Sequence, residues 1–140
     1  MTYLDLKNIT SGLLIADTSL PIDVEVLKGL VQYALTTVAT KADSLHLMTL
    51  NKDENILRLA QGDYLIRIPD VPNSDEDPVD IDDELIFAVA RYIASYISKE
   101  KGGIHAQIAD RIIKDYNAKV YEITGETAIK DENTGVIYAY

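Results

Sequence analysis

The stretch that decides the fold is Leu85-Ile86-Phe87-Ala88-Val89-Ala90-Arg91-Tyr92-Ile93-Ala94-Ser95-Tyr96-Ile97, which is apolar or weakly polar nearly all round. Carboxylates from Asp80 to Glu84 lie at its start, where they favour a helix, and Gly102-Gly103 are expected to stop it. A helix that is apolar on every side must be covered on more than one side. It is therefore either the central core helix or a helix covered partly by a neighbouring subunit. In the second case, the residues expected to pack between subunits are Ala88, Tyr92, Ala94 and Tyr96.

Two further helices flank this one in the sequence. Ser19, Pro21 and Asp23 form a helix-start cluster, and apolar residues recur at steps of three and four from Val24 to about Ala42. A similar stripe predicts a third helix from Ile104 to about Asn117. Residues 1–20 mix apolar and polar residues, and a short strand is expected over residues 13–15.

Two segments are expected to form strands. Alternating residues and polar turns over residues 44–68 predict an antiparallel meander of two or three strands, ended by Pro69 and Pro72. Residues 119–140 are interpreted as a β-hairpin arm. The arm residues expected to dock on a partner or on a neighbouring subunit are Tyr121, Ile137, Tyr138 and Tyr140.

The sequence thus predicts one α+β domain over residues 1–140. It has a three-helix body (20–118), a meander (44–68) inserted between the first two helices, and a C-terminal hairpin arm (119–140).

The composition excludes several classes of protein. The 140 residues contain no cysteine, so disulfides, thiolate zinc sites and cysteine nucleophiles are excluded. His46 and His105 are the two histidines, and neither lies in a metal-binding frame; His105 is expected at the surface. No phosphate-binding glycine loop and no nucleophile elbow is present, and no apolar run approaches the roughly 20 residues of a membrane span. The N-terminus lacks the features of a signal peptide. We expect no cofactor and no catalytic residue.

The charge is concentrated in one segment. The net charge is −10, and residues 69–84 contain eight acids and no base. This distribution argues against nucleic-acid binding by phosphate neutralisation and against adhesion to anionic membranes. The segment is either a solvated loop that maintains solubility or a surface that repels phosphates or holds a cation. Residues 75–82 offer oxygen ligands for calcium, but they lack the spacing of an EF-hand.

One arrangement of residues resembles a known family. It consists of the run Gly62-Asp63-Tyr64-Leu65-Ile66-Arg67-Ile68-Pro69, the acidic loop, Ile81-Asp82-Asp83-Glu84-Leu85, and the helix with Ala88, Arg91, Tyr92 and Ala94. Together with the helix that starts near Asp23, it resembles the head–tail adaptor (connector or neck) proteins of tailed bacteriophages. The resemblance covers roughly residues 20–118, and the predicted hairpin arm lies outside it.

This resemblance implies a structural, non-enzymatic virion protein. Such adaptors form a ring, typically twelve-fold, beneath the portal protein, extend the DNA channel, and present a platform to tail or neck proteins. The protein would then be in the virion neck, and in the host cytoplasm during assembly. Carboxylates repel DNA phosphates over about 8 Å at physiological salt, so DNA would pass without specific binding. The acids expected to line the channel or its rim are Asp75, Glu76, Asp77, Asp80, Asp82 and Asp83.

Two alternatives belong to other classes. One is an acidic DNA mimic that inhibits a nucleic-acid-binding protein, although this class needs carboxylates spread at regular spacing along a surface. The other is a calcium-dependent interaction module. An enzyme is the least favoured class.

Overall fold

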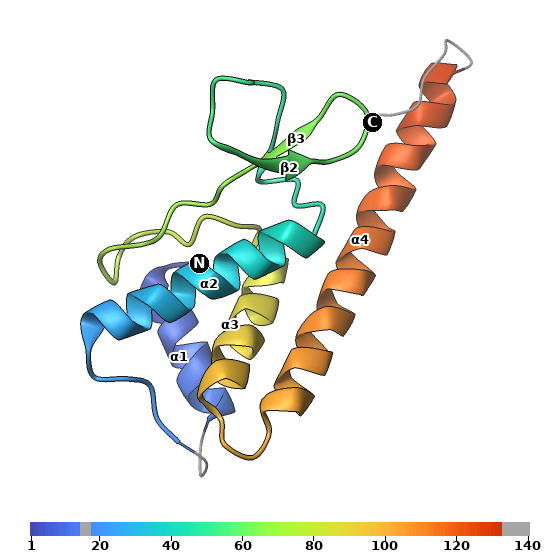
Figure 1. Ribbon diagram of the computed structural model, residues 1–140. Coiled ribbons are helices and arrows are strands. Elements are labelled where there is room, and N and C mark those ends of the chain that lie inside the picture. Colours follow the sequence, from blue (N-terminus) through green and yellow to red (C-terminus); the bar gives the residue numbers. More distant parts are fainter. Residues whose placement is uncertain (15–17, 133–140) are drawn as a thin grey trace.

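The computed structural model describes residues 1–14 and 18–132, and the side chains up to residue 121 (Figure 1). The elements in chain order are α1 (Tyr3–Leu13), α2 (Val24–Lys41), β1 (Met48–Thr49), β2 (Ile56–Leu59), β3 (Leu65–Arg67), α3 (Asp83–Ile97) and α4 (Gly102–Glu132). The predicted α+β class is confirmed. The described residues form four helices, whereas the sequence predicted three. None of the described helices is both long and apolar enough to cross a membrane.

The central position of α3 is confirmed. Helices α1, α2 and α4 all pack against it, so the chain itself supplies the cover that an apolar helix needs (Figure 1). Ala88 and Ala94 are fully buried, and Tyr92 is only 5% exposed. These three side chains therefore offer almost no surface to a neighbouring subunit. Tyr96, at 37% exposed, is the member of the expected packing set that still faces solvent.

The N-terminal helix α1 was not predicted. Thr2 begins it with a capping box, in which Asp5 N–H donates to Thr2 Oγ1 (3.2 Å) and Thr2 N–H donates to Asp5 Oδ2 (2.9 Å). Leu6 and Thr10 are buried on one face of the helix. The strand expected over residues 13–15 is wrong, because Leu13 is the last residue of α1; Ile15 lies outside the described residues.

Helix α2 begins where the sequence indicated. Asp23 is its N-cap, and one of its carboxylate oxygens accepts from the N–H groups of Glu25 (2.9 Å) and Val26 (3.3 Å). The buried residues of α2 are Leu27, Val31, Ala34, Leu35, Val38 and Ala39. All of them face α3 or the sheet side of the core, as an amphipathic helix requires.

Three antiparallel strands are present where two or three were predicted, but they do not form a meander. Their order is β1-β3-β2, so β3 is central and β1 and β2 are edges. The tight turn at Gly62, whose φ is +60°, keeps β2 and β3 adjacent, and β1 pairs with the other edge of β3 and not with the outer edge of β2. The sheet lies at the end of the body where α2 ends and α3 begins (Figure 1).

Helix α4 differs most from the prediction. It begins at Gly102, so the glycines expected to end the preceding helix start the next one. It also continues to Glu132, through the residues 119–124 that were expected to form a strand. The predicted hairpin arm is therefore wrong over its first strand. Ile137, Tyr138 and Tyr140 lie outside the described residues.

The start of α4 provides a matched test of packing. A Cβ added at Gly102 would lie 2.8 Å from the carbonyl oxygen of Ser95, whereas one added at Gly103 would meet nothing within 4 Å. We expect Gly102→Ala to lower the free energy of unfolding by about 1–3 kcal/mol, because backbone must move. Gly103→Ala should be neutral or stabilise by up to about 1 kcal/mol. Urea unfolding of both variants checks this, and equal effects would contradict the close approach.

Candidate functional site

The acidic segment, residues 69–84, is anchored along the N-terminus of the chain. Tyr3 N–H donates to Asp77 O (2.8 Å), and Val79 N–H donates to Met1 O (2.9 Å). The terminal ammonium of Met1 contacts Asp83 Oδ1 at 2.8 Å. The segment is therefore held by backbone pairing and by a terminal charge, which a freely solvated loop would not be.

Asp80 is the most tightly held acid of this segment. Arg67 donates to both of its carboxylate oxygens (2.5 and 2.7 Å), and His46 Nε2 and Asp70 N–H each lie 2.8 Å from one of them. Burial alone would raise the pKa of Asp80. The hydrogen bonds from Arg67, Asp70 N–H and His46 outweigh that effect and hold its pKa well below the usual range. Asp80 thus stays ionised and ties β3 to the segment that leads into α3.

Asp82 connects three other parts of the chain. Its Oδ1 accepts a short hydrogen bond from Ser44 Oγ, and its Oδ2 accepts from the Tyr116 hydroxyl (2.7 Å) and from His46 N–H (3.2 Å). Tyr116 in turn accepts from Leu45 N–H (2.9 Å). This carboxylate therefore joins the residues between α2 and β1 to α4, immediately before α3 begins.

The other acids of the segment differ in how fully their carboxylates are paired. Asp75 pairs with Lys7 (2.5 Å), and Glu84, in the first turn of α3, pairs with Lys119 of α4 (2.9 Å). Asp77 accepts from the N–H groups of residues 73 and 74, and these bonds lower its pKa. Glu76 is exposed and makes no ion pair with any described residue. Of the six acids expected at a channel rim, Glu76 is thus the one whose carboxylate makes no hydrogen bond or ion pair with a described residue.

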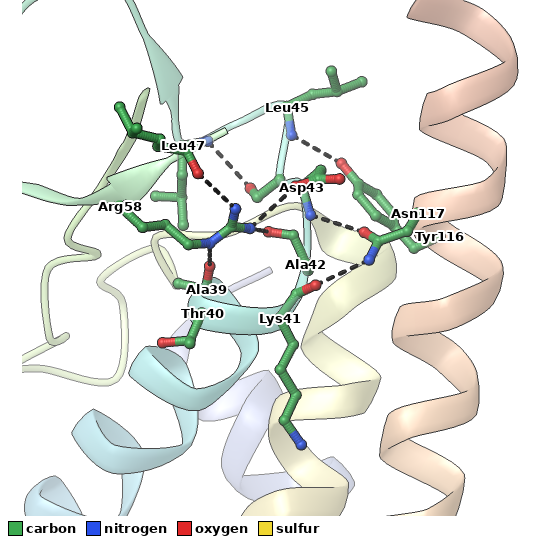
Figure 2. Close-up of polar contacts among 12 residues, drawn as sticks. Ala39, Thr40, Lys41, Ala42, Asp43, Leu45, Leu47, Arg58, Tyr116 and Asn117 are labelled. Atoms are coloured by element: carbon green, nitrogen blue, oxygen red, sulfur yellow. Dashed lines mark hydrogen bonds and ion pairs between the residues drawn. The ribbon is translucent and has the colours of Figure 1, made fainter. Parts of the chain in front are cut away.

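A second polar cluster, which the sequence did not indicate, closes the C-terminus of α2 (Figure 2). The Arg58 side chain donates to the carbonyl oxygens of Ala39 (3.1 Å) and Ala42 (2.6 Å) and contacts Asp43 Oδ1 (3.2 Å). Asn117 of α4 donates to Lys41 O (2.9 Å) and accepts from Asp43 N–H (2.8 Å). The last carbonyl groups of a helix have no partner within the helix, so these side chains satisfy them and place a positive charge there.

A third cluster joins α2, α3 and α4 at the surface. The Tyr92 hydroxyl donates a short hydrogen bond to Asp110 and accepts from Lys41 Nζ (2.8 Å). Three tyrosine rings form a column beside it. Tyr96 stacks on Tyr33 of α2 (centroids 5.1 Å apart) and on Tyr92 (6.4 Å). The cluster joins the three helices and gives the hydroxyl of the buried Tyr92 its hydrogen-bond partners.

Two surface hollows border the Arg67–Asp80 pair. The first, of about 290 Å³, lies between His46 and residues 70–72 and 77–80. The second, of about 470 Å³, is lined by Asp53, Glu54, Asn55, Arg67, Ile68 and Asp70. His46 and Asp80 resemble part of a catalytic triad, but Ser44 Oγ donates to Asp82 and not to the His46 ring. The arrangement therefore supplies no activated nucleophile among the described side chains.

The residues also do not assemble a metal site. No group of three or more His, Cys, Asp or Glu side chains within residues 1–14 and 18–121 is arranged to hold an ion. The position predicted for His105 is wrong, since it is 4% exposed at the start of α4, where its Nδ1 lies 3.0 Å from an Arg91 nitrogen. The spacing of Ile108 and Ile112 predicted the apolar face of this helix, but it did not indicate that His105 lies against Arg91 of α3.

Comparison of the chain with protein-family models, with curated proteins and with solved structures finds no match in any of the three.

The pair of Asp80 with Arg67 predicts a pH dependence of stability. Asp80→Asn should lower the free energy of unfolding at pH 7 by about 2 kcal/mol, since it removes hydrogen bonds between charged groups. A carboxyl whose folded pKa is depressed stabilises above its unfolded pKa of about 3.9, and this contribution is lost as pH falls below that value. The difference between wild type and Asp80→Asn should thus shrink from pH 5 to pH 2.5. Urea titrations across this range measure it, and Glu76→Gln is the control that should change little.

The Arg58 cluster makes a separate prediction. Arg58→Met keeps most of the apolar stem but removes the donors to Ala39 and Ala42, so we expect a loss of roughly 2 kcal/mol in thermal or urea unfolding. Lys52→Met, which removes an exposed charge near the same sheet, should stay within about 0.5 kcal/mol of wild type. Equal stability of the two variants would show that the cap contributes nothing.

Proposed function

We propose that this protein is a structural subunit of a phage neck: a head–tail adaptor that forms a ring on the portal protein and extends the DNA channel toward the tail. The support comes from the resemblance noted for residues 20–118 and from one geometric observation. That observation is the length of α4 relative to the body on which it packs.

Helix α4 runs antiparallel to α3 and extends beyond it. Lys119 pairs with Glu84, which lies in the first turn of α3, and the buried Val120 follows. From there α4 continues to Glu132, which at about 1.5 Å per residue carries it roughly 18 Å farther (Figure 1). Tyr121, where the projection begins, is 72% exposed. A helix that projects from a closed body is suited to contact another subunit, and it has no evident use in a small soluble enzyme.

In this proposal fewer acids line the channel rim than the six expected from the sequence. Asp80 and Asp82 are held inside the chain, and Asp77 is used in a turn. Of the acids expected at the rim, Glu76 is the one whose exposed carboxylate no described residue pairs with, whereas exposed Asp83 is paired with the Met1 ammonium. We place Glu76 at the channel rim, where fixed negative charge keeps DNA from adhering.

Density-gradient separation of material from the native source tests the proposal. The protein, followed by antibody or mass spectrometry, should travel with capsid-sized particles that contain DNA. Its presence only among small soluble species, while the capsid proteins sediment, would contradict a place in the virion. Association with a nucleic-acid-binding enzyme in those fractions would favour the DNA-mimic alternative.

The projecting helix makes a more specific prediction. Tyr121→Ser should leave the folded chain intact, with a melting temperature within about 2 °C of wild type, because the side chain is exposed. Incorporation of the variant into particles should fall, because the proposed arm contact is weakened. Leu59→Ser, which removes a similarly exposed apolar side chain from β2, is the matched control. Normal incorporation of Tyr121→Ser would remove this residue from the docking surface.

A further inference from the structure

The outward face of α4 forms a straight, unpartnered crest. At 3.6 residues per turn, Gln107, Arg111, Lys114 and Ala118 share the side opposite the buried face, and all four are exposed. Arg111 and Lys114 make no ion pair with any described residue. Asp110, at the flank of the crest, is already neutralised by Lys41. The centre of this face is therefore positive in a chain whose net charge is −10.

A hollow of opposite charge lies at the sheet. It is the second hollow described above, of about 470 Å³, with Asp53 and Glu54 on the turn between β1 and β2 and Asp70 after β3. None of these three carboxylates forms an ion pair within the described part of the chain. Arg67 in its wall is already neutralised by Asp80. The free charge in the hollow is thus negative, offset in the same turn only by exposed Lys52.

The two surfaces lie on opposite sides of the molecule. In Figure 1, α4 is on one side of the body, and the segments between β1 and β2 and after β3 are on the other. The charge follows the same division. Residues 42–82 carry 10 acids against 3 bases, whereas residues 102–121, the part of α4 that packs on the body, carry 3 bases against 2 acids; residues 122–132 of the projecting part add four acids and one base. A contact between identical copies that joins two different, complementary faces is a head-to-tail contact, which generates rings when it closes.

We infer that the α4 crest of one copy docks in the acidic hollow of the next copy, with Arg111 and Lys114 facing Asp53, Glu54 and Asp70. This inference rests on the proposed function, because the contact is the one that would join neighbouring subunits of the proposed ring. The contact pairs charges that remain unpaired within the chain, and it relieves part of the repulsion between copies of −10 charge. Asp115 beside the crest is placed to meet Lys52, the base at the rim of the hollow.

The absence of native cysteine permits a direct test by cross-linking. Lys114→Cys and Glu54→Cys chains are purified separately, mixed at high protein concentration and low salt, and oxidised. The disulfide between positions 54 and 114 is then quantified by mass spectrometry. The matched control is Lys114→Cys mixed with Asp63→Cys. Asp63 is also an exposed acid, but it lies in the turn at the opposite end of the β2–β3 hairpin.

The 54–114 disulfide should form in clear excess over the 63–114 disulfide. Adding Arg111→Glu to the Lys114→Cys chain should lower its yield about tenfold, and high salt should lower it too, because both weaken the charge pairing. Equal yields from the two mixtures, or a yield unchanged by Arg111→Glu, would overturn the contact.

The cross-link uses purified protein alone, so its outcome is separate from that of particle association. A specific cross-link in a protein that does not travel with particles would retain the contact and overturn the adaptor function. Incorporation into particles without the cross-link would retain the function and overturn this contact.

Discussion

The carboxylate of Asp82 is the interaction on which the arrangement of the helices depends. It lies one residue before α3 and binds Ser44, the backbone of His46 and the hydroxyl of Tyr116. Because α3 is apolar on every side, its position is specified poorly by hydrophobic burial, which has no direction. Directional hydrogen bonds from the residue that precedes it fix which neighbours its N-terminal end meets. Two residues earlier, Asp80 does the same toward the sheet through Arg67. Removing either acid would leave a partly buried donor without its partner, which costs more than the bond itself contributes.

The sequence was sufficient to predict the elements whose signal is local. Helix α3 follows from a continuous apolar run with acids before it, and α2 follows from a capping residue and a regular stripe. Helix α1 also carries a local signal, the Thr2–Asp5 capping box, which the mixed composition of residues 1–20 obscured. The strand order depends on which edge of β3 remains free after the Gly62 turn, and no local pattern encodes that. The β-branched residues between Lys119 and Thr124 favour a strand, yet α4 continues through them, which shows that a weak intrinsic preference is overridden by the helix already formed.

The site was less accessible to sequence reasoning than the fold. Eight acids in sixteen residues indicated a charged surface, but the pairings that use most of these acids join distant parts of the chain. Asp83 meets the N-terminal ammonium, and Asp75 meets Lys7. Tertiary pairing thus converts a negative segment into a structural element and leaves Asp70 and Glu76 as the acids of the segment whose carboxylates pair with no described residue. Arg58 and Asn117 were missed for the same reason, since a residue that caps a distant helix has no signature in its own surroundings.

The charges that remain unpaired within the chain lie on two different faces, with acids on one and bases on the other. This separation limits the orientations in which two copies can associate. Unpaired acids lie at the sheet and unpaired bases on the α4 crest, so a contact between these unlike faces is electrostatically more favourable than a contact between two like faces. Such a pattern disfavours two-fold dimers, in which like faces would meet, and favours head-to-tail growth. Whether that growth closes depends on the angle between the two faces, which a body packed around one central helix holds fixed. A straight α4, anchored to the same body by Asn117, Tyr116 and Lys119, keeps this angle equal in every copy. In the proposed ring, the polar contacts that hold α3 and α4 in place would therefore also set the angle between neighbouring subunits.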